Sequence, residues 1–249
     1  MKAIILAAGR GERLRPLTDK VPKPLTKIDG EPLIERHVKK LSESSFDEIV
    51  INLSYKGDQI EKHIGDGARY GIRVKYSKEG DQPLETLGGI LNALPLLGEI
   101  DQFVVINADI WTDYAMHKLL KSDANAHIVL APKSNLETGD FDLHQGMVQT
   151  SGSPPFMFTG IASYKASLFK GMIPEKKKLG PMLRLWAQQQ KLSGEIFHGK
   201  WFDIGTIESI HSYISIKFCK SSSTIKDTSS VSNDALSPGK NASRPRPAA

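Results

Sequence analysis

The stretch LAAGRGERLRPLTDKVPKP, residues 6–24, is the part of this sequence that decides its fold. It contains two glycines, three arginines, two lysines and three prolines, and it follows a short apolar run at residues 3–8. An apolar run of this length predicts a buried strand. Glycines and basic side chains directly after such a strand predict a phosphate site, because backbone N–H groups and cationic side chains both bind anions.

The sequence up to Pro132 alternates between strand and helix patterns. Strands are predicted at residues 2–7, 48–53, 72–77, 102–109 and 126–131, and helices at residues 33–44, 57–65, 88–97 and 113–122. In the first helix, Ile34, Val38 and Leu41 recur at the spacing of one helical face. Strands that alternate with helices predict an α/β fold with a doubly wound, mostly parallel, Rossmann-like sheet.

The pattern changes after Pro132. The sequence predicts a hairpin at 141–149, a strand at 155–164, a helix at 181–190, two strands within 195–205 and a closing helix at 206–218. Thr206 is the expected N-cap of that closing helix. This smaller, hairpin-containing part is expected to pack against the first and to form a cleft over the carboxyl ends of the parallel strands, where ligands bind in such sheets.

The last thirty residues differ in composition. Residues 220–249 are rich in Ser, Pro, Asn and Ala and have little to bury, which predicts one domain at 1–219 and a disordered tail at 220–249. The formal net charge is +5, and the tail, with five basic and two acidic residues, carries most of it. The body therefore lacks the basic stripe that is typical of nucleic-acid binding.

The N-terminal apolar run is too short for a secretory signal, and no apolar run reaches the roughly eighteen residues of a membrane span. The single cysteine, Cys219, excludes an internal disulfide framework and fits a reducing compartment. A cytoplasmic protein without a membrane partner is therefore expected.

Two common nucleotide-binding motifs do not fit residues 6–24. A dinucleotide fingerprint needs a third glycine where Leu14 stands, followed by a helix that Pro16 would interrupt. A P-loop needs lysine directly after its second glycine, and Glu12 stands there. A dinucleotide-dependent oxidoreductase is therefore disfavoured.

What remains is a glycine loop followed by a basic segment that is braced by prolines. Backbone N–H groups from Ala8 to Gly11 can line a concave anion site, and Arg13 can bind two phosphate oxygens. Lys23 lies between two prolines, which restrict the backbone and should hold its side chain in one direction.

The longer segment LAAGRGERLRPLTDKVPKPLTKIDGEPLI, residues 6–34, resembles the signature of the sugar-phosphate nucleotidylyltransferases, and the resemblance extends over roughly residues 1–217. Members of this family have an α/β fold and join a nucleoside triphosphate to a sugar 1-phosphate. The resemblance implies that nucleotide is bound by Ala8, Gly9, Gly11, Glu12, Arg13 and Lys23. It also implies that Arg13 and Lys23 act in catalysis.

The segments YSKEGDQPLETLGGI, WTDY and GDF are similar to one subgroup, uridylyltransferases that act on N-acetylmuramic acid α-1-phosphate. UTP and this sugar 1-phosphate are therefore the expected partners of a monomer or small homo-oligomer. The resemblance implies that Glu79, Gly80 and Thr86 receive the nucleobase and ribose. Asn107 and Asp140 are expected to contact the sugar substrate.

A bound triphosphate carries a metal ion, usually Mg²⁺, which requires oxygen ligands. Asp109 follows the apolar strand that ends at Asn107, and Asp203 ends another predicted strand. These two are far apart in the sequence, and the resemblance implies that the fold brings them together around Mg²⁺. Ala108 stands where relatives commonly have glycine, so its methyl group is expected to crowd the substrate without removing a ligand.

One element of many relatives is absent. Their second part contains Glu-Lys-Pro, whose lysine meets the sugar phosphate, whereas residues 150–164 here contain no lysine. This absence leaves the sugar-phosphate contact open and separates the chain from the thymidylyl and glucose-type branch of the family. Because the sequence does not fix the base or the sugar, a sister enzyme that uses mannose 1-phosphate or glucose 1-phosphate with GTP, UTP or dTTP stays an alternative. A catalytically silent nucleotide-sensing subunit is disfavoured, because Lys23, Asp109 and Asp203 are all present.

Overall fold

The computed structural model describes the whole chain except residues 81, 122, 134–137, 151 and 225–249. It divides into two units, residues 1–210 and 211–249. The first unit contains the sheet and the predicted site residues. In the described part of the chain, no helix is long and apolar enough to cross a membrane.

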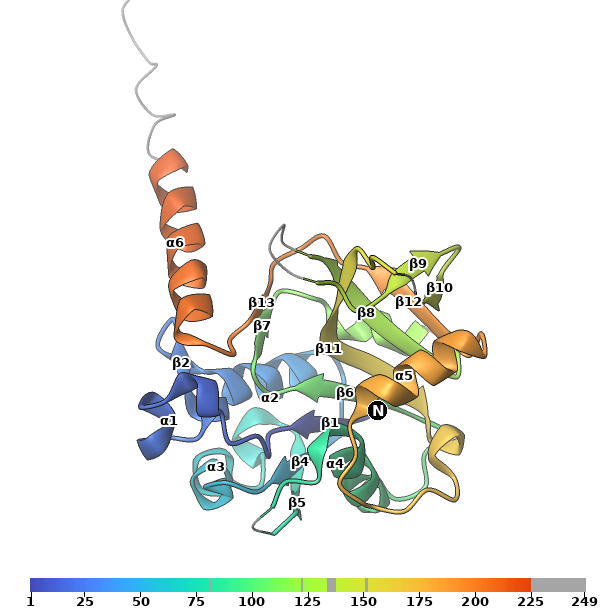
Figure 1. Cartoon of the computed structure of the whole chain (residues 1–249). Helices are drawn as coiled ribbons and strands as arrows, with labels where there is room; N and C mark the ends of the chain where they lie inside the picture. Colours follow the sequence, from blue (N-terminus) through green and yellow to red (C-terminus); the bar gives the residue numbers. More distant parts are fainter. Residues whose placement is uncertain (81, 122, 134–137, 151, 225–249) are drawn as a thin grey trace, which may run out of the picture. The chain divides into compact units, whose positions relative to one another are not determined.

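Within the described residues, nine strands form one sheet in the order β5-β4-β1-β6-β11-β8-β12-β10-β9 (Figure 1). Their bounds are β1 (Lys2–Leu6), β4 (Glu48–Leu53), β5 (Arg73–Lys78), β6 (Gln102–Asn107), β8 (Ala126–Pro132), β9 (Asp142–His144), β10 (Met147–Gln149), β11 (Phe156–Lys165) and β12 (Leu192–Ile196). The strands β5, β4, β1 and β6 are parallel to one another, β11 is antiparallel to both of its neighbours, and β12 is parallel to β8.

Two short pairs of strands lie outside this sheet, β2 (Lys27–Ile28) with β3 (Glu31–Pro32), and β7 (Ile110–Thr112) with β13 (Trp201–Asp203). The α-helices are α1 (Leu17–Lys20), α2 (Leu33–Glu43), α3 (Gly57–Ile64), α4 (Glu85–Ala93), α5 (Leu179–Gln188) and α6 (Ile207–Thr224). Short 3₁₀ helices lie at 12–14, 23–25, 68–70, 94–97, 116–121 and 166–169.

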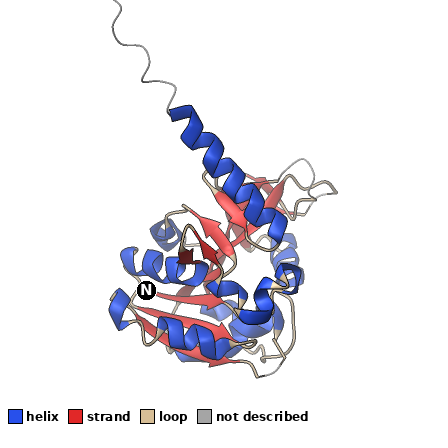
Figure 2. Cartoon of the chain, turned by 90° about the vertical axis from the view of Figure 1, so that its left-hand side faces the viewer, coloured by secondary structure: helices blue, strands red, loops and turns tan. Residues whose placement is uncertain are grey.

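Helices cover both faces of the sheet (Figure 2). Successive residues of a strand point to opposite faces, and β1 shows this clearly. Ile5 packs in the core that contains Val38 of α2, whereas Ile4 packs in the core that contains Ile90 of α4. The predicted α/β fold with a doubly wound, mostly parallel sheet is therefore confirmed.

The smaller part, which was expected to pack against the first, continues the sheet of the first part. Its hairpin, β9 and β10, extends the edge of the same sheet, because β10 pairs with β12 and β12 pairs with β8. The two strands predicted on either side of Gly199 both form, but β12 joins the large sheet while β13 pairs with β7. Thr206 caps α6 as predicted, since its Oγ1 accepts a hydrogen bond from the Ser209 N–H at 3.1 Å.

Three helix predictions were wrong in extent or type. The helix predicted at 88–97 begins already at Glu85 and ends at Ala93, and it passes into a 3₁₀ turn at Pro95, which lacks an N–H group. The helix predicted at 113–122 is a 3₁₀ helix at Met116–Lys121, because the Thr112 hydroxyl accepts a hydrogen bond from the Tyr114 N–H and holds the preceding residues in a turn. The helix α6 continues to Thr224, so residues 220–224 are helical, and residues 225–249 of the predicted tail lie outside the described residues.

The parallel strands position the candidate site. Because β1, β4, β5 and β6 run in the same direction, the loops that follow Leu6, Leu53, Lys78 and Asn107 meet at one edge of the sheet. These loops contain most of the predicted site residues.

Candidate functional site

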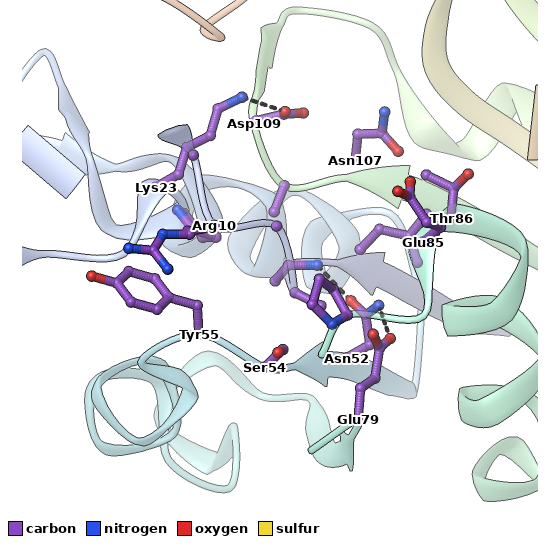
Figure 3. Close-up of a pocket in the computed structure, with 18 of the residues that line it drawn as sticks. Arg10, Lys23, Asn52, Ser54, Tyr55, Glu79, Glu85, Thr86, Asn107 and Asp109 are labelled. Atoms are coloured by element: carbon purple, nitrogen blue, oxygen red, sulfur yellow. Dashed lines mark hydrogen bonds and ion pairs between the residues drawn. The ribbon is translucent and has the colours of Figure 1, made fainter. Parts of the chain in front are cut away.

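A cavity of about 1100 Å³ lies at this carboxyl edge (Figure 3). Its volume is at the upper end of ordinary ligand sites, which leaves room for two substrates. It brings together the predicted residues Ala8, Gly9, Gly11, Glu12, Arg13, Lys23, Glu79, Gly80, Thr86, Asn107 and Asp109. Asp140 and Asp203 are the predicted site residues that do not line it.

The glycine loop, residues 8–11, has the features that an anion site requires. Within the described part of the chain, its backbone N–H groups donate to no protein acceptor. Gly11 has φ +70°, and a Cβ atom there would lie 2.9 Å from Cβ of Lys23 and 3.0 Å from Cγ2 of Thr18. Glycine is therefore required at this position for both its backbone conformation and its close packing.

Lys23 is almost buried and points into the cavity. Its Nζ donates a hydrogen bond of 2.5 Å to Oδ2 of Asp109, and the two side chains are 9% and 33% exposed. Pro22 holds an extended backbone at φ −63° and ψ 146°, and Pro24 is the second residue of the 3₁₀ turn that begins at Lys23. The prolines therefore fix the position from which this lysine reaches the carboxylate.

The pairing of β7 with β13 brings the backbone of Asp109, which directly precedes β7, next to the end of β13, where Asp203 lies. Asp203 is opposite Ile110, and the Ile204 N–H donates to the Asp109 carbonyl at 2.9 Å. A Cβ atom on Gly205 would lie 2.9 Å from Oδ1 of Asp203 and 3.1 Å from Nη2 of Arg13. The Asp203 carboxylate and the Arg13 guanidinium therefore both lie against this glycine, which itself lines the cavity.

These two aspartates fit a magnesium ion by their chemistry. Within the described residues, no group of three or more His, Cys, Asp and Glu side chains could hold a metal by itself. Mg²⁺ does not need such a cage in nucleotide enzymes, because it is usually bound by one or two carboxylates together with water and substrate phosphates. Lys23 contacts Oδ2 of Asp109, so Oδ1 is the oxygen of this carboxylate that could bind the ion.

A polar network under the cavity fixes the loop after β5. Oδ1 of Asn52 accepts from the Ala7 N–H at 2.5 Å, and its Nδ2 donates to Oε1 of Glu79 at 2.6 Å. The other oxygen of Glu79 accepts from the Leu84 N–H at 2.7 Å. Burial raises the pKa of Glu79, and these two hydrogen bonds partly oppose that shift. Glu79 thus connects the glycine loop to the beginning of α4, in addition to lining the cavity.

Asn107 and Asp140 meet in a second, smaller cavity of about 140 Å³, which shares Thr86 and Asn107 with the large one. Oδ2 of Asp140 accepts from the Phe158 N–H at 2.9 Å. The register of β11 shifts between Phe158 and Ala162, and a Cβ atom on Gly160 would lie only 2.6 Å from Nδ2 of Asn107. The bulge therefore makes the space that the Asn107 side chain occupies.

Several lining residues were not predicted from the sequence. Arg10 and Lys56 lie on the ring of Tyr55, at 5.0 and 5.5 Å from its centroid, in cation–π contacts. Tyr55 and Lys56 follow the carboxyl end of β4. Because ligands bind at such strand ends, this position could have indicated them from the sequence. Lys176 and Lys178 line the cavity from a loop before α5, and nothing in the local sequence pointed to it.

The other predicted contacts are placed as follows. Oγ1 of Thr86 accepts from the Leu179 N–H at 2.8 Å, and the Gly80 carbonyl accepts from the Ser54 hydroxyl at 3.0 Å. Ala108 is 1% exposed, so its methyl group belongs mainly to the core and adds little to the cavity surface.

The charge of the large cavity suits polyanionic ligands. Its lining contains the basic residues Arg10, Arg13, Lys23, Lys56, Lys176 and Lys178 and the acidic residues Glu12, Glu79, Glu85 and Asp109. Lys23 pairs with Asp109 across the cavity wall (Figure 3), so five further basic residues of the lining face three further acidic ones. Such an arrangement stabilises negative charge in phosphate compounds.

Comparisons with known proteins identify the family of this chain. The sequence model of a family described as Nucleotidyl transferase matches residues 2–134. The chain is 42% identical over 219 residues to N-acetylmuramate alpha-1-phosphate uridylyltransferase of Neisseria meningitidis serogroup B, an alignment that covers 83% of this chain and 94% of the relative. It is 29% identical over 221 residues to mannose-1-phosphate guanylyltransferase catalytic subunit beta of Xenopus tropicalis, covering 82% of this chain and 61% of the relative.

A solved structure has the same fold. HddC from Yersinia pseudotuberculosis aligns with a TM-score of 0.73 at 23% identity and covers 87% of this chain and 99% of that chain. At this level of identity the likeness concerns the fold alone.

Proposed function

Because this chain belongs to the nucleotidyl transferase family, we propose that it joins UTP to N-acetylmuramic acid α-1-phosphate, with UDP-N-acetylmuramic acid and pyrophosphate as products. The observation that carries the proposal is the 42% identity to a uridylyltransferase of this name, which extends over 94% of that relative. The proposal is supported by the cavity, in which a glycine loop, Lys23 and Asp109 lie together at the carboxyl edge of the sheet.

In the proposed reaction, an oxygen of the sugar phosphate attacks the α-phosphorus of UTP. The new P–O bond forms as the bond to the β-phosphate bridging oxygen breaks, and pyrophosphate leaves in line with the attack. The attacking oxygen is already anionic, so the reaction needs no general base. Catalysis then consists of positioning the two substrates and neutralising their charge.

The glycine loop, Arg13 and Lys23 are assigned to the triphosphate. The free N–H groups of the loop bind phosphate oxygens, and Arg13 can bind two of them in a fork. Lys23 stabilises the charge that develops on the leaving pyrophosphate. Asp109 and Asp203 would hold Mg²⁺, which supplies further charge neutralisation when it is bound.

The uracil and ribose are assigned to the loop after β5, which includes Glu79 and Gly80, and the sugar to the second cavity. Asp140 there can accept hydrogen bonds from sugar hydroxyl groups. Muramic acid also has a carboxylate on its lactyl ether. The guanidinium of Arg184 lines the same cavity, 5.7 Å from the Phe141 ring centroid, and is the group that can bind this carboxylate.

We place the reaction in the cytoplasm and in the recycling of peptidoglycan, because UTP is a cytoplasmic nucleotide and muramic acid is a component of peptidoglycan. The enzyme is proposed to act as a monomer or small homo-oligomer, without nucleic acid or membrane as a partner.

The decisive experiment measures pyrophosphate release by the purified protein over a grid of nucleoside triphosphates and sugar 1-phosphates. We expect the highest kcat/KM with UTP and N-acetylmuramic acid α-1-phosphate, and a lower value with N-acetylglucosamine 1-phosphate, which lacks the lactyl group. A preference for GTP with mannose 1-phosphate would instead support the reaction named for the Xenopus relative. No release with any pair would favour a nucleotide-sensing protein.

A further inference from the structure

The loop before α5 is attached to the first turn of α4. We call residues 175–178, EKKK, the lysine strap. The Lys177 carbonyl accepts hydrogen bonds from the Leu87 and Gly88 N–H groups at 2.9 and 3.2 Å, and the Lys177 N–H donates to the Leu84 carbonyl at 2.9 Å. The strap therefore binds backbone groups at the beginning of α4 that no preceding turn of helix can satisfy.

Close packing further fixes the strap. A Cβ atom on Gly88 would lie 2.1 Å from the Glu175 carbonyl oxygen. Only glycine allows the strap to approach the helix this closely. The next residue along the chain, Leu179, donates its N–H to Oγ1 of Thr86 at 2.8 Å. The backbone from Glu175 to Leu179 is thus held against the beginning of α4 by four hydrogen bonds and one close approach.

The strap directs its lysines to different sides. Lys178 has the extended backbone angles φ −79° and ψ 144°, and successive side chains of an extended chain point in opposite directions. Lys176 and Lys178 line the large cavity. Lys177 does not line it, and its Nζ lies 3.3 Å from Oε1 of Glu175.

The strap is attached to the side of the cavity that lies opposite the residues assigned to the triphosphate. Figure 3 shows Glu85 and Thr86, which begin α4, on the side opposite Lys23 and Arg10. Thr86 lines both cavities and therefore marks the place where they join. The strap is hydrogen-bonded to Leu84, Leu87 and Gly88, so it lies beside this junction. A sugar bound in the small cavity would place its phosphate at the same junction. A sugar phosphate at this junction would lie across the large cavity from the glycine loop.

We propose that Lys176 and Lys178 bind the phosphate of the sugar 1-phosphate. The inference rests on the proposed function, since it requires a sugar phosphate as the second substrate. The phosphate carries up to two negative charges, and it must approach a triphosphate that is itself anionic. Two ammonium groups on a fixed strap offset this repulsion and orient the attacking oxygen. Lys177 has no part in binding, because its side chain points away from the cavity.

Steady-state kinetics test the proposal with the matched set Lys176→Ala, Lys178→Ala, the double variant, and Lys177→Ala as control. All three lysines are exposed, so the variants should fold, and thermal melting verifies this. We expect KM for the sugar 1-phosphate to rise about tenfold in each single variant and further in the double variant, which is the scale of a lost hydrogen bond to a charged group. The KM for UTP should change less than about twofold, and Lys177→Ala should behave like the unmodified protein.

Kinetics of the reverse reaction distinguish binding of the sugar phosphate from a general effect on the cavity. In the reverse direction, the double variant should show the same KM for pyrophosphate as the unmodified protein and a raised KM for the UDP-sugar. An equal rise in KM for UTP and for the sugar 1-phosphate, or no difference from Lys177→Ala, would overturn the proposal. If the unmodified protein prefers another sugar 1-phosphate, the proposed function is wrong, and the same variants test the strap with that substrate.

Discussion

The Nζ of Lys23 lies 2.5 Å from Oδ2 of Asp109, so the proline-braced lysine neutralises a residue that is expected to bind metal. A buried cation beside a carboxylate weakens the attraction of that carboxylate for a second cation. The same lysine is also expected to contact the triphosphate. Its two partners, Asp109 and phosphate, therefore compete for one ammonium group.

Replacement of Lys23 by alanine should separate these two effects. We expect kcat/KM for UTP to fall by an amount equivalent to about 2–3 kcal/mol, the upper range for a hydrogen bond to a charged group. Binding of Mn²⁺ without nucleotide, measured by electron paramagnetic resonance, should become tighter, because Asp109 loses its internal cation. Lys20→Ala is the control, since Lys20 is exposed on the same segment. A loss of less than about threefold in kcat/KM would show that Lys23 has no role in UTP use.

Lys23→Arg should rescue activity poorly. The stem of Lys23 passes Gly11 so closely that a methyl group on the glycine would lie 2.9 Å from it, which leaves little room for a planar guanidinium. Steady-state kinetics with UTP varied decide this. Activity of Lys23→Arg near that of the unmodified protein would mean that any cation suffices there.

Asp109→Asn and Asp203→Asn should each lower turnover by about a hundredfold or more, the scale seen when a group that stabilises charge in the transition state is lost. Asp203 is exposed, so thermal stability should change little in Asp203→Asn. Asp109→Asn should fold but lose some stability, because it leaves the nearly buried Lys23 without its carboxylate partner. Asp101→Asn, at an exposed position before β6, is the matched control. Full activity of either variant at saturating Mg²⁺ would remove that aspartate from the metal site.

Arg184→Gln should lower the preference of the enzyme for a sugar 1-phosphate with a carboxylate over one without it. We expect kcat/KM for N-acetylmuramic acid α-1-phosphate to fall about tenfold or more, and that for N-acetylglucosamine 1-phosphate to stay nearly constant, because only the first has a charge for the guanidinium to bind. Equal losses with both sugars would indicate that Arg184 supports the cavity and does not select the substrate.

Stability should decrease as the pH falls below neutrality, because of His37. Burial lowers the pKa of this side chain from about 6.5 to about 4, and its Nε2 is hydrogen-bonded to the Ile110 carbonyl at 2.9 Å. The unfolded chain binds the proton first, so the free energy of unfolding falls as pH decreases from about 6.5 to about 4. Thermal melting of a His37→Gln variant should show a weaker pH dependence over this range than the exposed control His144→Gln. If the melting temperatures of both variants depended equally on pH, His37 would not be the group responsible.

The sequence predicted the elements whose patterns are local. The apolar runs of β1 and β6 and the single-faced helix α2 are buried because their own residues require it, so their positions could be predicted without knowledge of the rest of the chain. Asp109 and Asp203 were selected from family motifs. That their backbones lie on neighbouring segments could only be seen in the structure, because it depends on the pairing of β7 with β13.

The residues that were missed depend on contacts between distant segments. Lys176 and Lys178 belong to a run of three lysines that is typical of a solvated loop, and they reach the cavity only because α4 binds the strap. Arg184 lies on a helix that was correctly predicted, but its position over Phe141 depends on the hairpin edge of the sheet. The absent Glu-Lys-Pro lysine left the sugar-phosphate contact open, and no local pattern could indicate a substitute.

The first turn of α4 has contacts in two directions. Glu79 holds the Leu84 N–H on the nucleotide side, while the Leu87 and Gly88 N–H groups hold the lysine strap on the sugar side. In the proposed roles, either substrate reduces the motion of this same short segment when it binds. The first substrate to bind bears the cost of the conformational entropy that this segment loses, so the second substrate does not bear it again. We therefore expect UTP and the sugar phosphate to bind with positive cooperativity.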